Sequence, residues 1–345
     1  MKQYKFLNTE FHGVIIHGVS PLNPLKGTSV PEKTETNCGL FMPQKSPLGD
    51  LGVNKNNMKY IIISLLLFLF FSCTEDIAIH TDDSKPVVVI YGILTDEFTQ
   101  KSVKVTWSSP YFDTQPNVGI SGATVKMTDS DSKTYDFFEN DTVPGLYETK
   151  TMWAAKVGVT YSLSVETNSE GDKKTYEAST TILPPIEVDS ITIVPANILG
   201  NKNYAVNLYG NEPEGEDFYL CKYIVRDSLV TAKISQYDVL DDAMFDGQYV
   251  NGLTLRFFDS IENWATDSEE RRKNSVYLAS GDKVELQMSR IPEGYFDFIS
   301  QCQREMEGSN PFFGGPPANI TTNITNGGVG YFSGYCISRA VAITP

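Results

Sequence analysis

Histidine and cysteine are scarce in this sequence of 345 residues, which contains three histidines and five cysteines. His80 is the only histidine after residue 17, so a Ser-His or Cys-His catalytic pair is not expected within the strand-rich part of the chain. The cysteines form no CxxC element, which excludes the usual zinc pattern, and HExxH, GxSxG, P-loop and GxGxxG motifs are absent. The sequence therefore predicts neither an enzyme nor a bound cofactor or metal.

Basic residues are also few: the sequence has 28 basic and 43 acidic residues, which gives a net charge of −15. Nucleic-acid binding depends on many contacts between basic side chains and phosphates, so no nucleic-acid partner is expected. The proportions of hydrophobic residues (41%) and charged residues (21%) are those of a globular protein, and the length suffices for two domains.

No apolar run reaches the roughly 20 residues that a membrane-spanning helix needs. The most apolar segment, Tyr60–Phe71, has the length of a signal-peptide core, with Lys59 before it and Ser72-Cys73 after it. This arrangement resembles a bacterial lipoprotein signal, in which residues 58–72 are removed and Cys73 is acylated. A buried core helix is the alternative, which the acidic stretch directly after the run disfavours.

Signal peptides stand at the N-terminus of a protein, yet 57 residues precede Met58. They contain several prolines and no sustained hydrophobic period. We expect translation to begin at Met58 and residues 1–57 to reflect a start codon assigned too far upstream. A disordered leader is the alternative.

Residues 73–85 are short on apolar side chains and suit a lipidated tether between a membrane and a fold. Glu75 and Asp76 resemble the acidic surface-export signal of Bacteroidota lipoproteins, which favours display on the outer surface over the periplasmic face. Three cysteines remain in the fold, and free buried thiols are favoured over one disulfide pair. They are Cys221, Cys302 and Cys336.

From residue 86 onward the sequence has the two-residue period of β-strands. Val87–Tyr91 is a continuous, mostly β-branched run, while Val103–Trp107 and Ala123–Met127 alternate apolar with polar residues. Turn-forming residues separate such runs, and Pro184-Pro185 cannot continue a central ladder. Residues 86–184 are therefore predicted to form an immunoglobulin-like β-sandwich of about seven strands.

Residues 186–345 are predicted to form a second β-rich domain, which makes the whole fold mainly β. Several alternating segments predict strands, and a last strand pair is expected around Gly330–Phe332 and Tyr335–Ile337. One amphipathic helix opens at Pro292 and stops at Gly308, and we expect its apolar stripe to pack on a sheet rather than bind a partner. The stripe consists of Tyr295, Phe298, Ile299, Cys302 and Met306.

Two groups of acidic residues imitate ligand sites. Asp129 and Asp131 match the start of a calcium loop whose other positions are missing, so a hairpin turn is favoured. Asp241, Asp242 and Asp246 could supply carboxylates. Solvated loop acids are the favoured interpretation, because catalysis by paired acids needs a separation that sequence does not give.

Aromatic residues in loops are the candidate contacts for a ligand or partner: Trp153, Trp264, Phe312 and Phe313. Packing in a core explains each of them at least as well.

Several short segments occur in an order typical of one protein family. They are Val87–Asp96, Ile120–Val125, Gly145–Tyr147, Val157–Leu163, Pro317–Ile320 and Gly328–Phe332. With the lipoprotein start they resemble the domain of unknown function 4249 lipoproteins of Bacteroidota, from about Cys73 to Pro345, with residues 1–57 outside the match. The resemblance implies an envelope lipoprotein often encoded beside a TonB-dependent outer-membrane transporter, without established enzymatic activity or catalytic residues.

The expected function is that of a non-enzymatic accessory: a lipid-anchored protein of the outer membrane that docks on a TonB-dependent transporter or helps to capture its substrate. The alternative is a stand-alone carbohydrate-binding or adhesive module on the cell surface. Exposed coplanar aromatic rings would favour glycan binding, whereas a broad apolar patch would favour a protein partner.

Overall fold

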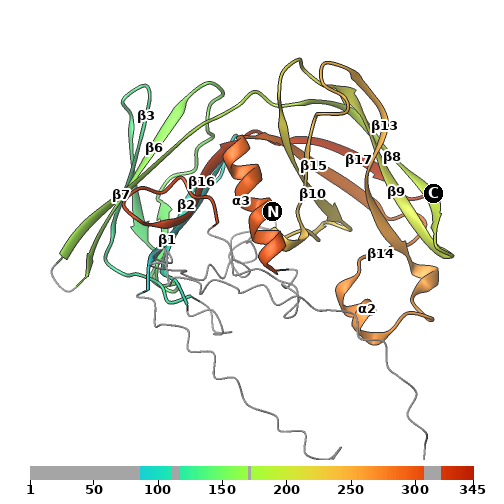
Figure 1. The fold of residues 1–345 in the computed structure, drawn as a ribbon, viewed down its shortest axis with the longest axis horizontal. Coiled ribbons are helices and arrows are strands. Elements are labelled where there is room, and N and C mark those ends of the chain that lie inside the picture. Colours follow the sequence, from blue (N-terminus) through green and yellow to red (C-terminus); the bar gives the residue numbers. More distant parts are fainter. Residues whose placement is uncertain (1–85, 110–116, 170–171, 307–319) are drawn as a thin grey trace, which may run out of the picture. The chain divides into compact units, whose positions relative to one another are not determined.

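The computed structural model describes residues 86–109, 117–169, 172–306 and 320–345, which are mainly β-strand (Figure 1). This confirms the expected fold class. The first sheet has eight strands in the spatial order β16-β1-β2-β5-β4-β3-β6-β7. Their bounds are β1 (Val88–Thr95), β2 (Ser102–Trp107), β3 (Thr124–Asp129), β4 (Thr134–Glu139), β5 (Leu146–Thr149), β6 (Thr160–Ser169), β7 (Asp172–Thr181) and β16 (Val329–Tyr335).

The first sheet curls around one hydrophobic core, to which all eight of its strands contribute side chains. Its two edge strands, β7 and β16, are linked by the side chain of Asn323. The Asn323 amide donates to the carbonyl oxygen of Ser179 at 3.3 Å and to that of Phe332 at 2.7 Å. The sheet therefore packs against itself as the two layers of a β-sandwich do.

Strand β1 is apolar at almost every position because both of its faces are covered. Val88, Ile90 and Leu94 belong to the core of the first sheet, whereas Val89 and Tyr91 belong to a second cluster that contains a helix. Strand β3 instead alternates strictly between exposed and buried residues, since only one of its faces is covered.

Two further sheets face each other over a separate core, formed among others by Val206, Tyr223 and Leu286. One has the order β11-β10-β15-β17, with β12 also paired to β10, and the other has the order β14-β13-β9-β8. Their bounds are β8 (Glu187–Ile198), β9 (Asn201–Asn211), β10 (Phe218–Val225), β11 (Ser228–Leu229), β12 (Asp238–Asp241), β13 (Tyr249–Ser260), β14 (Tyr277–Leu278), β15 (Lys283–Ile291) and β17 (Ser338–Ile343).

The last two strands enter different sheets. Strand β16 runs parallel to β1, with Gly330 opposite Ile90, whereas β17 pairs with β15. The expectation of a final strand pair is therefore wrong, because parallel pairing with a strand more than 200 residues earlier leaves no local pattern in the sequence. The predicted division at residues 184–186 separates β1–β7 from β8–β15, while β16 returns to the first sheet.

Helix α3 (Glu293–Met306) confirms the predicted amphipathic helix. Four of the five predicted stripe residues are buried, and Met306 is the partly exposed fifth. The helix packs against Tyr91 of β1, Leu220 of β10 and Tyr331 of β16, as expected for a stripe that covers strands. In the described ranges no helix is long and apolar enough to cross a bilayer.

The three cysteines of the described fold are free and buried, as their spacing predicted. Burial raises the pKa of the Cys302 thiol to about 12 and that of the Cys336 thiol to about 11. Neither thiol is therefore a reactive thiolate at neutral pH.

Candidate functional site

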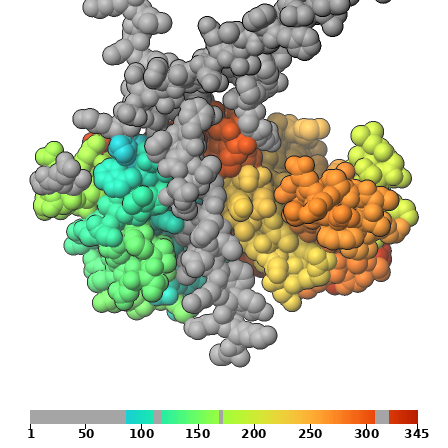
Figure 2. All heavy atoms as spheres, turned by 90° about the horizontal axis from the view of Figure 1, so that it is seen from below, coloured from blue at the N-terminus to red at the C-terminus, as the bar shows by residue number. Residues whose placement is uncertain are grey.

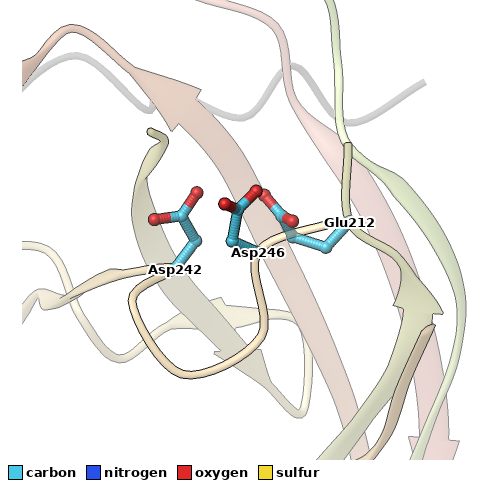
Figure 3. Close-up of side chains that lie close together, drawn as sticks. All are labelled: Glu212, Asp242 and Asp246. Carbon is cyan, nitrogen blue, oxygen red and sulfur yellow. The ribbon is translucent and has the colours of Figure 1, made fainter. Parts of the chain in front are cut away.

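Three carboxylates converge where two loops of the second β-rich part meet (Figure 3). Glu212 directly follows β9, Asp242 directly follows β12, and Asp246 lies in the turn that leads to β13. One oxygen from each side chain lies within 4.8 Å of the others. We call these three residues the acidic cluster.

The backbone of the turn fixes the acidic cluster. The N–H groups of Phe245 and Asp246 donate to the carbonyl oxygen of Asp242 at 2.7 and 2.9 Å, which closes the turn. The N–H of Glu212 then donates to the carbonyl oxygen of Gln248 at 3.1 Å, so that the turn is bonded to the end of β9.

Glu212 is 4% exposed and each of its carboxylate oxygens accepts one hydrogen bond. The Tyr219 hydroxyl donates to Oε1 at 2.9 Å, and the Gly247 N–H donates to Oε2 at 2.5 Å. Burial raises the pKa of Glu212, these two hydrogen bonds lower it, and the charges of Asp242 and Asp217 raise it further. The net shift is upward.

Asp217, which is 3% exposed, is a fourth carboxylate beside the acidic cluster. Its N–H donates to Oδ2 of Asp242 at 2.8 Å, and its carbonyl oxygen accepts from the N–H of Asp242 at 3.2 Å. Its Oδ1 pairs with Arg290, while its buried Oδ2 has no hydrogen-bond donor. Burial and the charge of Asp242 raise the pKa of Asp217 against the opposing effect of Arg290.

The interpretation of Asp242 as a solvated loop acid is wrong, because this residue is 3% exposed. Asp241 and Asp246 are exposed, as expected. Sequence spacing could not reveal the acidic cluster, since Glu212 comes from another loop 30 residues earlier and is brought near Asp242 by the pairing of β9 with β13 and of β10 with β12.

The pair Asp129 and Asp131 forms a hairpin turn between β3 and β4. Oδ1 of Asp129 accepts from the N–H groups of Asp131 at 3.1 Å and Lys133 at 2.8 Å, and its Oδ2 accepts from the Tyr135 hydroxyl at 3.0 Å. These bonds use both carboxylate oxygens within the turn.

Trp153 is a core residue rather than a ligand contact. It is 9% exposed, its ring stacks on Tyr135 at 4.3 Å between centroids, and the Lys101 ammonium lies 5.6 Å from the ring centroid. Trp264 is 46% exposed and remains a candidate contact. Phe312 and Phe313 lie outside the described residues, as do Cys73, Glu75 and Asp76.

The burial of Lys101 beside Trp153 in the core of the first sheet can be tested through the pH dependence of folding stability. Its Nζ donates to the carbonyl oxygen of Glu97 at 2.7 Å and to the Thr99 hydroxyl at 3.0 Å, and burial lowers its pKa to about 8 despite the nearby charges of Glu97 and Asp96. Between pH 8 and the ordinary pKa of 10.5 the unfolded chain therefore binds more protons than the folded one at this residue. The contribution of Lys101 to the free energy of unfolding therefore becomes more stabilising as pH rises through that range.

We therefore expect the difference in unfolding free energy between wild type and Lys101→Met to shift in favour of the wild type as pH rises from 7 to about 10. Urea unfolding at several pH values measures this difference, and groups common to both proteins cancel. If the difference in unfolding free energy stayed constant over this pH range, the lowered pKa that burial gives Lys101 would be contradicted.

Exposed apolar side chains gather at one end of the sheet formed by β8, β9, β13 and β14. On its outer face, Val194 of β8 and Phe257 of β13 lie on either side of Ala205 of β9, in register. Ile198 is the last residue of β8, and Leu199 lies in the turn between β8 and β9, where it is 99% exposed.

The segment after β13 lies at this same end of the sheet (Figure 1). The side chain of Asn263, in the short 3-10 helix η3 (Ile261–Asn263), exchanges two hydrogen bonds with the backbone of Lys202, at 3.3 and 2.6 Å. This segment continues through α2 (Glu269–Asn274) and forms much of the orange surface in Figure 2. We call the exposed apolar residues at this end the hairpin patch: Val194, Ile198, Leu199, Phe257, Ile261 and Trp264.

A family model described as "Domain of unknown function (DUF4249)" matches residues 74–339. The chain belongs to this family. The match spans β1 to β16 and includes the residues of the acidic cluster and of the hairpin patch. No curated protein matches the sequence.

Solved structures similar to this DUF4249 chain include a cytokine receptor complex, at 8% identity and a TM-score of 0.21, with 72% of this chain and 94% of that chain covered. Another is the chicken interferon gamma receptor alpha chain, at 9% identity and a TM-score of 0.17, with 76% of this chain and 100% of that chain covered. With scores this low, neither match bears on function.

Proposed function

We propose that this chain is a non-enzymatic accessory lipoprotein of the outer membrane that binds a TonB-dependent transporter through the hairpin patch. Cys73 carries the lipid anchor in this proposal, and Glu75-Asp76 direct the protein to the outer surface. The hairpin patch is the observation that carries the proposal, because several exposed apolar side chains gathered at one end of a rigid sheet are typical of an interaction site.

The composition of the hairpin patch favours a protein partner over a glycan. Four of its six side chains are aliphatic: Val194, Ile198, Leu199 and Ile261. Trp264 meets Tyr277 edge-on, at an interplanar angle of 79°, so this pair offers no coplanar platform for a sugar ring. Aliphatic and aromatic side chains together are typical of the central part of a protein interface.

Leu199 is the most telling residue of the hairpin patch. It is 99% exposed and has a φ of 51°, in the left-handed region that a leucine rarely adopts. Asparagine or aspartate would suit this turn better, so stability of the free chain does not explain the leucine. Contact with a partner does.

The test is mass spectrometry of what co-purifies with the tagged, lipidated full chain from gently solubilised outer membranes. We expect recovery of a TonB-dependent transporter, and a drop of at least about tenfold in that recovery with Leu199→Asp, since central apolar contacts contribute about 1.4 kcal/mol or more. Aspartate tolerates a positive φ, so this variant keeps the turn.

The matched control is Phe98→Asp, which removes a side chain that is 72% exposed and lies outside the hairpin patch, between β1 and β2. It should leave recovery of the transporter unchanged. Recovery of the lipoprotein alone, where other envelope complexes survive, would contradict the proposal and favour the stand-alone carbohydrate-binding or adhesive module. Equal losses in both variants would contradict the assignment of the hairpin patch.

A further inference from the structure

We propose that Glu212, Asp242 and Asp246 bind one calcium ion. Calcium contacts carboxylate oxygens at about 2.3–2.6 Å, so oxygens on opposite sides of one ion lie up to about 5 Å apart. The three oxygens of the acidic cluster lie within 4.8 Å of one another, which lets a single ion contact them all. Figure 3 shows the three side chains converging from two loops.

A separate observation at Asp217 also points to a cation. Its Oδ2 is buried without a hydrogen-bond donor, in a residue that is 3% exposed. The Asp217 carboxylate is close enough to the acidic cluster for its charge to raise the pKa of Glu212. A buried carboxylate oxygen without a donor is costly, and a divalent ion in the acidic cluster would offset that cost electrostatically.

The local charge supports the same conclusion. Among the described residues, Arg290 is the one basic side chain in ion-pair contact with this group of four carboxylates, and it contacts Asp217. The acidic cluster itself therefore has three carboxylates without a positive partner in that part of the chain. Such a set is stable at neutral pH when a cation neutralises it.

Calcium fits better than magnesium. Calcium accepts six to eight oxygen ligands in flexible geometry, whereas magnesium keeps several of its waters and binds through one or two carboxylates. Three carboxylates from two loops fit the coordination of calcium better than that of magnesium. Asp246 is exposed, which gives the ion a path from solvent and leaves room for water ligands.

Binding would add to the hydrogen bonds that already join two connections of the chain, such as those between Asp217 and Asp242. Glu212 begins the β9–β10 connection, while Asp242 and Asp246 belong to the β12–β13 connection. An ion held by all three would stabilise the fold, since a ligand that binds only the folded state shifts the unfolding equilibrium.

The test uses the full chain, freed of metal with a chelator and then titrated with calcium chloride alone. At calcium concentrations of about 100 times Kd, we expect the melting temperature to rise by about 4 °C or more. The same concentration of magnesium chloride should give less than half of this shift. No shift at about 10 mM calcium, above the weak extracellular range of Kd, would overturn the proposal.

Two variants distinguish specific binding of calcium at the acidic cluster from nonspecific screening of the negative charge of the protein. Asp246→Asn removes an exposed ligand and should weaken calcium binding by at least about tenfold in calorimetric titration, a loss of about 1.4 kcal/mol. Asp241→Asn removes the same charge from an exposed residue outside the acidic cluster and should change Kd by less than about twofold. Equal effects of the two variants would overturn the site.

Discussion

Gly330→Ala is expected to lower the free energy of unfolding by about 4 kcal/mol or more, because backbone strain adds to a clash that no side chain can relieve. Gly330 has a φ of 102°, and a Cβ there would lie 2.1 Å from the carbonyl oxygen of Ile90. That oxygen belongs to β1, the parallel partner of β16. The substitution therefore forces apart β1 and β16, two strands more than 200 residues apart in the sequence.

The control for this prediction is Gly281→Ala, at a φ of 86° with no atom within 4 Å of the added Cβ. It carries only the strain of a left-handed conformation, about 1–2 kcal/mol. Urea unfolding of both variants, followed by circular dichroism, measures the difference. Equal midpoints for the two variants would mean that β16 does not lie against β1 as described.

The sequence predicts strands well where one face is covered, and the reason is physical. Alternation in Ala123–Met127 reports a strand with one buried face, and β3 shows that pattern residue by residue. The continuous run Val87–Tyr91 predicts a strand as well, but only the structure reveals that the two faces of β1 serve two different clusters. The local sequence pattern predicts that a strand forms, but which elements cover its second face depends on contacts with distant parts of the chain.

Contacts between distant parts of the chain lie beyond such patterns. The parallel pairing of β16 with β1 and the meeting of Glu212 with Asp242 both depend on the order of strands in a sheet. A run of separate acids in a loop looks solvated in sequence, and burial appears only once another loop closes over it. Local pattern therefore identifies Asp242 and Asp246 as candidate carboxylates but does not place Glu212 beside them.

The hairpin patch shows the same limit for aromatic residues. Trp153 and Trp264 are alike in the sequence, each in a connection between strands, yet one is 9% exposed and the other 46% exposed. Trp153 pairs through its backbone with Thr99, which draws it onto the core of the first sheet. Nothing in the residues next to either tryptophan distinguishes the two environments.

Trp153→Ala is accordingly expected to lower the free energy of unfolding by about 3–5 kcal/mol, the usual range for removing a large buried aromatic ring. The ring contacts Tyr135 and Tyr161, with centroids 4.3 and 5.6 Å away, and it covers the ammonium of Lys101. Alanine would leave a cavity and open a buried charge to water. Urea unfolding gives the size of the loss.

Two further variants sharpen this test. Trp153→Phe keeps a ring on Tyr135 and removes an indole N–H that has no acceptor, so its loss should be under half of the alanine loss. Trp264→Ala should cost about 1 kcal/mol at most, because the side chain is 46% exposed, and should instead reduce recovery of the transporter. If Trp153→Ala proved nearly as stable as the wild type, Trp153 would be an accessible contact residue, and the aromatic core around Lys101 would have to be abandoned.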